Sequence, residues 1–207
     1  MMTDLFLFPF IKGFTTTAGL IVAIGIQNAF ILRQGLLKSH SFVVALLASA
    51  IDSVMIFLGV SGVGVIIASH PYWLVAAKYG SMLFLFLYGC RCFYFAVFKS
   101  NTINDKEVVG KRSLKSTIIT LMAVSFLNPH MYVDTLLLIG TIGGQLPDAQ
   151  KLYYVGGAIL ASTIWFFLLS YGARLLIPIF QKPLSWKILD TIIGMVMWFM
   201  VFSIWCS

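Results

Sequence analysis

Long apolar runs separated by short polar connectors dominate the chain. A helix needs about 20 mostly apolar residues to cross a bilayer, and six runs reach that length. They cover residues 5–32, 41–68, 72–98, 116–142, 152–178 and 186–206. Lys12 and a threonine triplet interrupt the first run. The pattern predicts an all-α polytopic membrane protein with six transmembrane helices, folded as a single transmembrane domain over residues 1–207.

Composition supports the same class of protein. Hydrophobic residues make up 60% of the chain and charged residues 10%, whereas soluble domains are about 25% charged. The mean hydropathy is +0.97. The net charge of +7 does not indicate nucleic-acid binding, because no soluble basic domain is predicted. The chain has no nucleotide-binding or hydrolase motif, so we expect no enzyme activity and no cofactor.

The basic residues predict an orientation. Most of the 14 Lys and Arg residues, Arg33 among them, fall in connectors on one side of the six predicted spans. The other side holds Lys12, Lys78 and Lys151. The positive-inside rule places the first side in the cytoplasm and both termini outside. If the first run did not span, the N-terminus would lie inside instead. The hydrophilic stretch 99–115 is interpreted as a solvated connector.

The runs divide into two halves of three, residues 1–98 and 113–207, joined by that connector. An odd number of spans per half inverts the second copy, which gives the 3+3 inverted repeat of many secondary transporters. Polar interruptions occur at matching places, at 25–28 in the first run and 128–130 in the fourth. Such paired interruptions indicate a binding site between the halves.

Two acids, Asp52 and Asp134, are predicted to lie near the middle of the bilayer. An aspartate at that depth costs about 2.5–3.5 kcal/mol on insertion scales, and no Lys or Arg is expected at comparable depth. The two carboxylates are therefore candidates to bind a proton or a positively charged substrate. The alternative is that both are protonated and hydrogen bonded to Ser or Thr neighbours.

The interruptions supply further candidates. Pro129 removes a helical hydrogen bond and predicts a break in the fourth span. The amides of Asn128, Gln27 and Asn28 could bind a substrate or cap the broken helices. His130 could relay protons, since histidine titrates near physiological pH, or act as an ordinary hydrogen-bond donor between helices.

These motifs carry a resemblance to a known family. Gln27-Asn28-Ala-Phe30, continuing to Leu-Arg-Gln-Gly35, and the stretch from Asn128 to Thr135 resemble the two signatures of LysE-type basic amino-acid exporters, most closely their arginine-exporter branch. The resemblance implies export of L-arginine or L-lysine through the bacterial inner membrane. The family has prolines around the first interruption, where this chain has Ile-Gly25-Ile. Gly25 must therefore permit the predicted break alone.

Export of a cation from a negative cytoplasm costs about 2.3 kcal/mol per 100 mV, so proton exchange is the expected coupling. A divalent-metal exporter, with Asp52, His130 and Asp134 as ligands, is one alternative. A membrane-embedded redox protein is another, although Cys90 and Cys92 lack the C-x-x-C spacing, and neither they nor Cys206 form a metal pattern. Expected partners are a basic amino acid, protons and the lipid bilayer; a homo-oligomer stays open.

Overall fold

The computed structural model describes residues 2–22, 25–63, 71–98, 113–128 and 131–206, and within them every regular element is a helix. The elements are α1 (Met2–Ile21), α2 (Ile26–Leu36), α3 (Ser41–Val60), α5 (Pro71–Phe98), α7 (Leu114–Phe126), the π-helix η1 (Met131–Ile139), α8 (Gly140–Gly144), α9 (Asp148–Gly172), the short 3-10 helices η2 (Ala173–Leu176) and η3 (Ile179–Gln181), and α10 (Pro183–Cys206).

Four of the described helical segments are long and apolar enough to cross a membrane: Ser41–Val60, Lys78–Phe98, Asp148–Leu176 and Leu184–Cys206. Two interrupted pairs, α1 with α2 and α7 with η1 and α8, reach that length together. The count is six if each pair is one span. The chain is therefore an all-α, multi-pass membrane protein, as the sequence predicted, with its first and fourth spans broken.

Local sequence explains several helix ends. Ser113 caps α7, where its side-chain oxygen accepts a hydrogen bond from the backbone N–H of Ser116, as favoured at helix starts. Pro183 opens α10 at a position where no backbone N–H is required. The predicted second span, 41–68, is too long: α3 ends at Val60, and Gly62 follows in a turn with φ of +89°, a conformation that glycine adopts without strain.

The chain folds into two compact units, each built from both sequence halves. Unit 1 contains residues 1–23, 45–75 and 129–167, and unit 2 contains residues 24–44, 76–128 and 168–207. The chain passes between units at both breaks and also within α3, α5 and α9.

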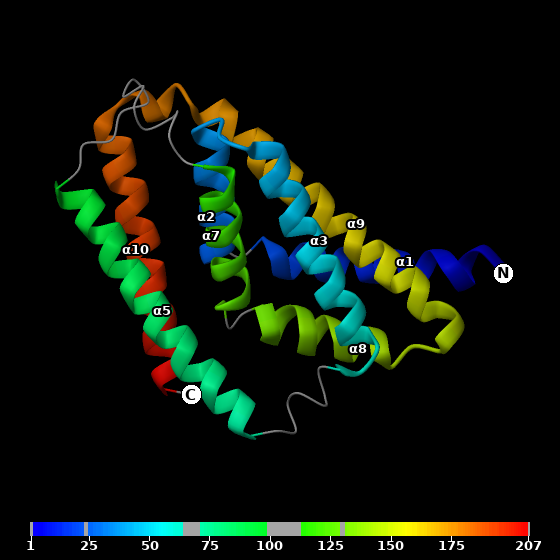
Figure 1. Cartoon of the computed structure of the whole chain (residues 1–207). Coiled ribbons are helices and arrows are strands. Elements are labelled where there is room, and N and C mark those ends of the chain that lie inside the picture. Colours follow the sequence, from blue (N-terminus) through cyan, green and yellow to red (C-terminus); the bar gives the residue numbers. More distant parts are fainter. Residues whose placement is uncertain (1, 23–24, 64–70, 99–112, 129–130, 207) are drawn as a thin grey trace. The chain divides into compact units, whose positions relative to one another are not determined.

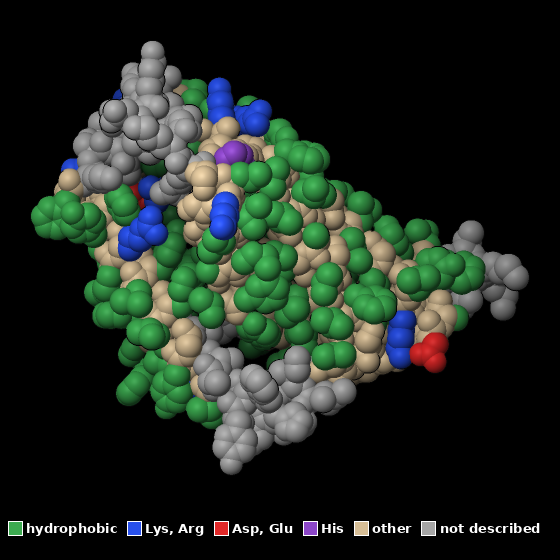
Figure 2. Space-filling model, in the orientation of Figure 1, with side chains coloured by type: hydrophobic (Ala, Val, Ile, Leu, Met, Phe, Trp, Pro, Cys, Tyr) green, Lys and Arg blue, Asp and Glu red, His purple; other side chains and the backbone are tan. Residues whose placement is uncertain are grey.

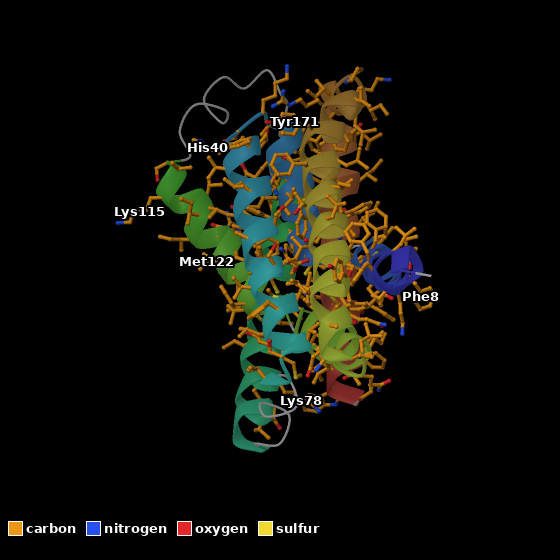
Figure 3. The ribbon with its side chains drawn as sticks, turned by 90° about the vertical axis from the view of Figure 1, so that its right-hand side faces the viewer. Phe8, His40, Lys78, Lys115, Met122 and Tyr171 are labelled. Atoms are coloured by element: carbon orange, nitrogen blue, oxygen red, sulfur yellow. The ribbon has the colours of Figure 1, made fainter. Side chains whose placement is uncertain are left out.

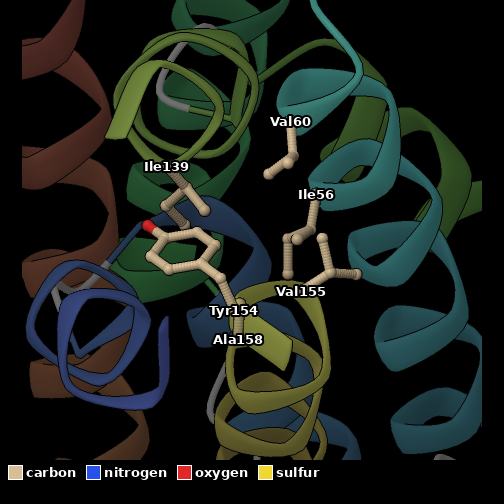
Figure 4. Close-up of a cluster of buried hydrophobic side chains, with 6 residues drawn as sticks. All are labelled: Ile56, Val60, Ile139, Tyr154, Val155 and Ala158. Atoms are coloured by element: carbon tan, nitrogen blue, oxygen red, sulfur yellow. The ribbon is translucent and has the colours of Figure 1, made fainter. Parts of the chain in front are cut away.

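The core of unit 1 joins α3, η1 and α9. Ile56 and Val60 of α3 pack against Ile139 of η1 and against Tyr154, Val155 and Ala158 of α9 (Figure 4). Glycines bring backbones close at two further contacts. A Cβ on Gly140 would lie 2.6 Å from the carbonyl carbon of Gly59, and one on Gly157 would collide with the backbone of α1 at Phe10. Small residues permit such close approach between membrane helices.

Unit 2 pairs α5 with α10 and α2 with α7 (Figure 1). Trp198 of α10 stacks on Phe86 and contacts Phe93 edge-on. A second cluster, around Leu36 of α2, includes Trp186, whose indole N–H donates to the Phe180 carbonyl at 2.8 Å. These contacts hold α2, α5, α7 and α10 within one unit.

Large apolar side chains are exposed on every long described helix. In Figure 2 they cover most of the visible described surface, and Lys and Arg side chains occupy only a few places. Phe8 on α1 and Met122 on α7 are two of the exposed residues, and both are labelled in Figure 3. A monomeric soluble protein rarely exposes so much contiguous apolar surface, whereas a lipid bilayer would cover it.

Candidate functional site

Asp52 is buried in α3, within unit 1. Asp52 is 5% exposed, and the Ser162 side chain of α9 lies within hydrogen-bonding reach of its carboxyl group. The neighbouring hydroxyls of Ser49 and Ser53 donate instead to backbone carbonyls one turn earlier in α3, at 2.8 and 2.6 Å. Among the described residues, no Lys or Arg forms an ion pair with Asp52.

Asp134 lies in η1, the element that packs against α3. Met131 and Leu136 of η1 form a buried cluster with Met55, and Ile51 and Tyr132 pack against it. These contacts pack η1, which bears Asp134, against α3, which bears Asp52, within unit 1. Asp134 itself is half-buried. A π-helix is rare and often marks a functional site.

The polar residues at the first break and those at the end of α7 come together in unit 2. Gln27, Asn28 and Asn128 are all buried. A Cβ on Gly25 would lie 3.7 Å from the Asn128 side-chain nitrogen, so the start of α2 meets the end of α7. The sequence match between the two interruptions therefore corresponds to proximity in space. The Gln27 side-chain nitrogen has no hydrogen-bond partner among the described residues.

Both predicted breaks are present. α1 ends at Ile21 and α2 starts at Ile26; α7 ends at Phe126 and η1 starts at Met131. Gly25 is extended, with φ −99° and ψ 178°. Any residue can adopt that conformation, so position 25 does not require the conformational freedom of glycine. Pro129 and His130, both predicted site residues, lie outside the described residues.

One predicted feature is wrong. The sequence assigned Arg33 to a connector, yet α2 continues to Leu36. The Nη1 atom of Arg33 lies 2.9 Å from Oδ1 of Asp190 in α10, with the two side chains 12% and 1% exposed. Asp190 was not among the predicted site residues. It is the one acid in the sixth apolar run, and a single acid within an apolar run is a pattern that could have marked it as a candidate.

The described residues contain neither a metal-binding cluster nor a disulfide that could serve the metal or redox alternatives. No group of three His, Cys, Asp or Glu side chains suited to a metal ion occurs among the described residues. Cys90, Cys92 and Cys206 are free thiols. The described residues therefore offer two separate sets of polar groups: two carboxyl groups on packed elements of unit 1, and three buried amides in unit 2.

Comparisons with known proteins agree along nearly the whole chain. A family model described as LysE type translocator matches residues 18–205. Arginine exporter protein ArgO of Yersinia enterocolitica is 33% identical over 195 residues, covering 94% of this chain and 95% of that protein. The protein of the same name from Serratia proteamaculans is 33% identical over 189 residues, covering 91% and 92%. No solved structure matches the chain.

Proposed function

The chain belongs to the LysE-type translocator family, and from this premise we propose that it exports L-arginine, with L-lysine as a second substrate. It carries the amino acid out of a bacterial cytoplasm across the inner membrane, in exchange for a proton. Relatives that are named arginine exporters, 33% identical along nearly their full length, support arginine as the substrate.

The observation that carries the proposal is Asp52, buried in α3 beside η1, the element that bears Asp134. Burying an ionised carboxyl group in a membrane segment costs free energy. A proton or a cation that neutralises the group removes this cost. Within unit 1 the Lys and Arg residues are Lys12 and Lys151, and Lys151 pairs with exposed Asp148 at 2.8 Å. The guanidinium of an arginine substrate matches the missing cation, and its planar fork suits a carboxylate.

Proton exchange follows from the same two acids. Moving one positive charge outward against the membrane potential costs about 2.3 kcal/mol per 100 mV. If the pair Asp52 and Asp134 releases one proton to the cytoplasm when the substrate cation binds and regains one from outside after its release, no net charge crosses. The buried amides of Gln27, Asn28 and Asn128 are further candidates to contact the substrate within unit 2, and His130 would relay the proton.

The order in which the chain visits its two units supports an inverted 3+3 repeat. The first span passes from unit 1 to unit 2 and the second returns; the fourth passes from unit 2 to unit 1 and the fifth returns. Equivalent helices thus exchange units in opposite directions. The third and sixth, α5 and α10, both lie in unit 2 apart from the first residues of α5. The first two spans of each half thus follow the relation expected of two copies inserted in opposite orientations, and the third spans do not.

The direct test uses cells that lack their own exporter and are challenged with toxic analogues of arginine and of lysine. The chain should protect against the arginine analogue. Asp52→Asn should lower arginine efflux at least about 100-fold, since a buried charge partner is worth about 3–5 kcal/mol, and Asp134→Asn should lower it as well. Asp148→Asn is the matched control, because Asp148 is exposed. Normal efflux by both test variants would overturn the proposal.

Coupling and orientation need separate tests. In proteoliposomes, arginine efflux should accelerate when an inward proton gradient is imposed; indifference to the gradient would refute proton exchange. Reporter fusions after residues 3, 36 and 105 should report outside, inside and inside. A change in the metal tolerance of expressing cells would favour the divalent-metal alternative.

A further inference from the structure

We propose that a cavity in unit 2, of about 110 Å³ and walled by α2, α5 and α7, is an oxyanion site that binds the α-carboxylate of the exported amino acid. The inference rests on the proposed function and concerns the carboxylate end of the substrate. The side chains that carry the argument are Arg33, Tyr88, Arg91, Phe95, Ser116 and Thr120.

Two guanidinium groups line this cavity, and only one has an acidic partner. Arg33 is paired with Asp190 at 2.9 Å. Among the described residues no acid pairs with Arg91, so the charge of the cavity wall is not balanced within the described part of the chain. A guanidinium presents its N–H donors in a plane that matches the two oxygens of a carboxylate. An oxyanion is the chemical class of ligand that this wall fits.

Phe95 fixes both guanidinium groups against one aromatic ring. The central carbon of Arg33 lies 5.8 Å from the ring centroid and that of Arg91 lies 5.5 Å from it. Both distances are within the range of cation–π attraction. Ordering a long side chain costs conformational entropy. Because the ring already restrains the two arginine side chains, ligand binding has less side-chain entropy to overcome. The donors are therefore arranged before a ligand arrives.

The third wall, from α7, also favours a negative ligand. Ser116 lies in the first turn of this 13-residue helix, where the helix dipole is positive. Thr120 lines the cavity one turn later and donates its hydroxyl proton to the Ser116 carbonyl at 2.8 Å. The Thr120 oxygen keeps its acceptor capacity, which suits the ammonium group beside a substrate carboxylate. The cavity thus offers donors for a carboxylate and an acceptor for the adjoining ammonium.

This site would separate amino acids from simple amines. A guanidinium or ammonium side chain alone satisfies a pair of carboxyl groups, so the acids of unit 1 cannot distinguish arginine from agmatine, its decarboxylated analogue. The guanidinium of Arg91 can, because only arginine brings a carboxylate to it. A lipid phosphate is an oxyanion as well, and the experiment separates that source from the substrate.

The test is transport by the purified full-length protein in liposomes, with arginine as substrate and agmatine as competitor. Arg91→Gln should raise the KM for arginine at least about tenfold, the effect of losing a charged hydrogen bond, and leave the inhibition constant of agmatine unchanged. Arg91→Lys should fall between wild type and Arg91→Gln. Arg174→Gln is the matched control: Arg174 is exposed, also rests on an aromatic ring, at 4.5 Å from that of Tyr171, and does not line the cavity.

Each other outcome has a distinct meaning. An arginine KM within twofold of wild type in Arg91→Gln, with agmatine still discriminated, overturns this inference and leaves the proposed function standing. A wild type that moves no arginine overturns the proposed function and this occupant together. If the effect of Arg91→Gln is present in liposomes with an anionic phospholipid and disappears in purely zwitterionic ones, the cavity binds a lipid phosphate, and the carboxylate assignment is wrong.

Discussion

Removing the Asp190 carboxylate should destabilise unit 2 strongly. Asp190→Asn would leave the Arg33 guanidinium, 12% exposed, facing a neutral amide in place of the carboxylate that lies 2.9 Å from it. Breaking a buried ion pair from one side typically costs about 3–5 kcal/mol, because the remaining charge stays desolvated. We expect the free energy of unfolding to fall by that amount, and by a similar amount in Arg33→Gln.

The assay is a double-mutant cycle on the purified protein. The folded fraction in mixed micelles is followed as the denaturing detergent is increased, for wild type, Arg33→Gln, Asp190→Asn and the double variant. The double variant should lose much less than the two single losses combined, because neither charge is then left alone. Replacing the pair with Arg33→Met and Asp190→Leu should recover most of the lost stability, since apolar groups of similar volume often replace buried ion pairs without loss.

A matched control exists in unit 1. Lys151 and Asp148 also form a pair, at 2.8 Å, but the Asp148 side chain is 95% exposed. Exposed pairs contribute little, so a cycle on these two residues should show no measurable coupling. If the coupling between Arg33 and Asp190 falls below about 1 kcal/mol, the range of exposed pairs, the pair does not hold α2 to α10 and the reasoning fails.

Three further predictions concern packing and the acids. Gly140→Val should lower the free energy of unfolding by about 1–3 kcal/mol through overpacking against α3. Gly80→Val is the control and should behave as wild type, because no atom lies within 4 Å of its Cβ position. Equal losses of stability in the two variants would contradict this prediction. Gly25→Ala should keep full arginine efflux, because its backbone is extended and its Cβ would meet nothing closer than 3.7 Å; lost efflux would show that glycine is required there. Ser162→Ala should lower efflux no more than about tenfold, the worth of one hydrogen bond, so a loss as large as that of Asp52→Asn would show that Ser162 has a larger role.

Apolar run length was sufficient to predict the helices and both interruptions. Hydropathy is a local property, and a break needs only a polar stretch inside an apolar run, as around Asn128. Proline content was a poorer guide at the first break. There α2 starts directly after an extended Gly25, although the neighbouring residues in the sequence, Ile24 and Ile26, stand where the resemblance led us to expect prolines. The end of α3 at Val60 was missed, because apolar residues continue beyond Gly62.

Long-range pairing was beyond the reach of sequence analysis. Arg33 and Asp190 are 157 positions apart, and each stands at the edge of an apolar run, where a charge normally faces water or lipid headgroups. Only the packing of α2 with α10 shows that the two neutralise each other. The same packing changes the meaning of Arg91. With Arg33 neutralised by Asp190, Arg91 becomes the unbalanced charge of the described cavity wall, and the positive-inside rule, which treats both residues as orientation signals, cannot distinguish them. Of the two guanidinium groups in the described cavity wall, Arg91 is therefore the one that we propose binds substrate.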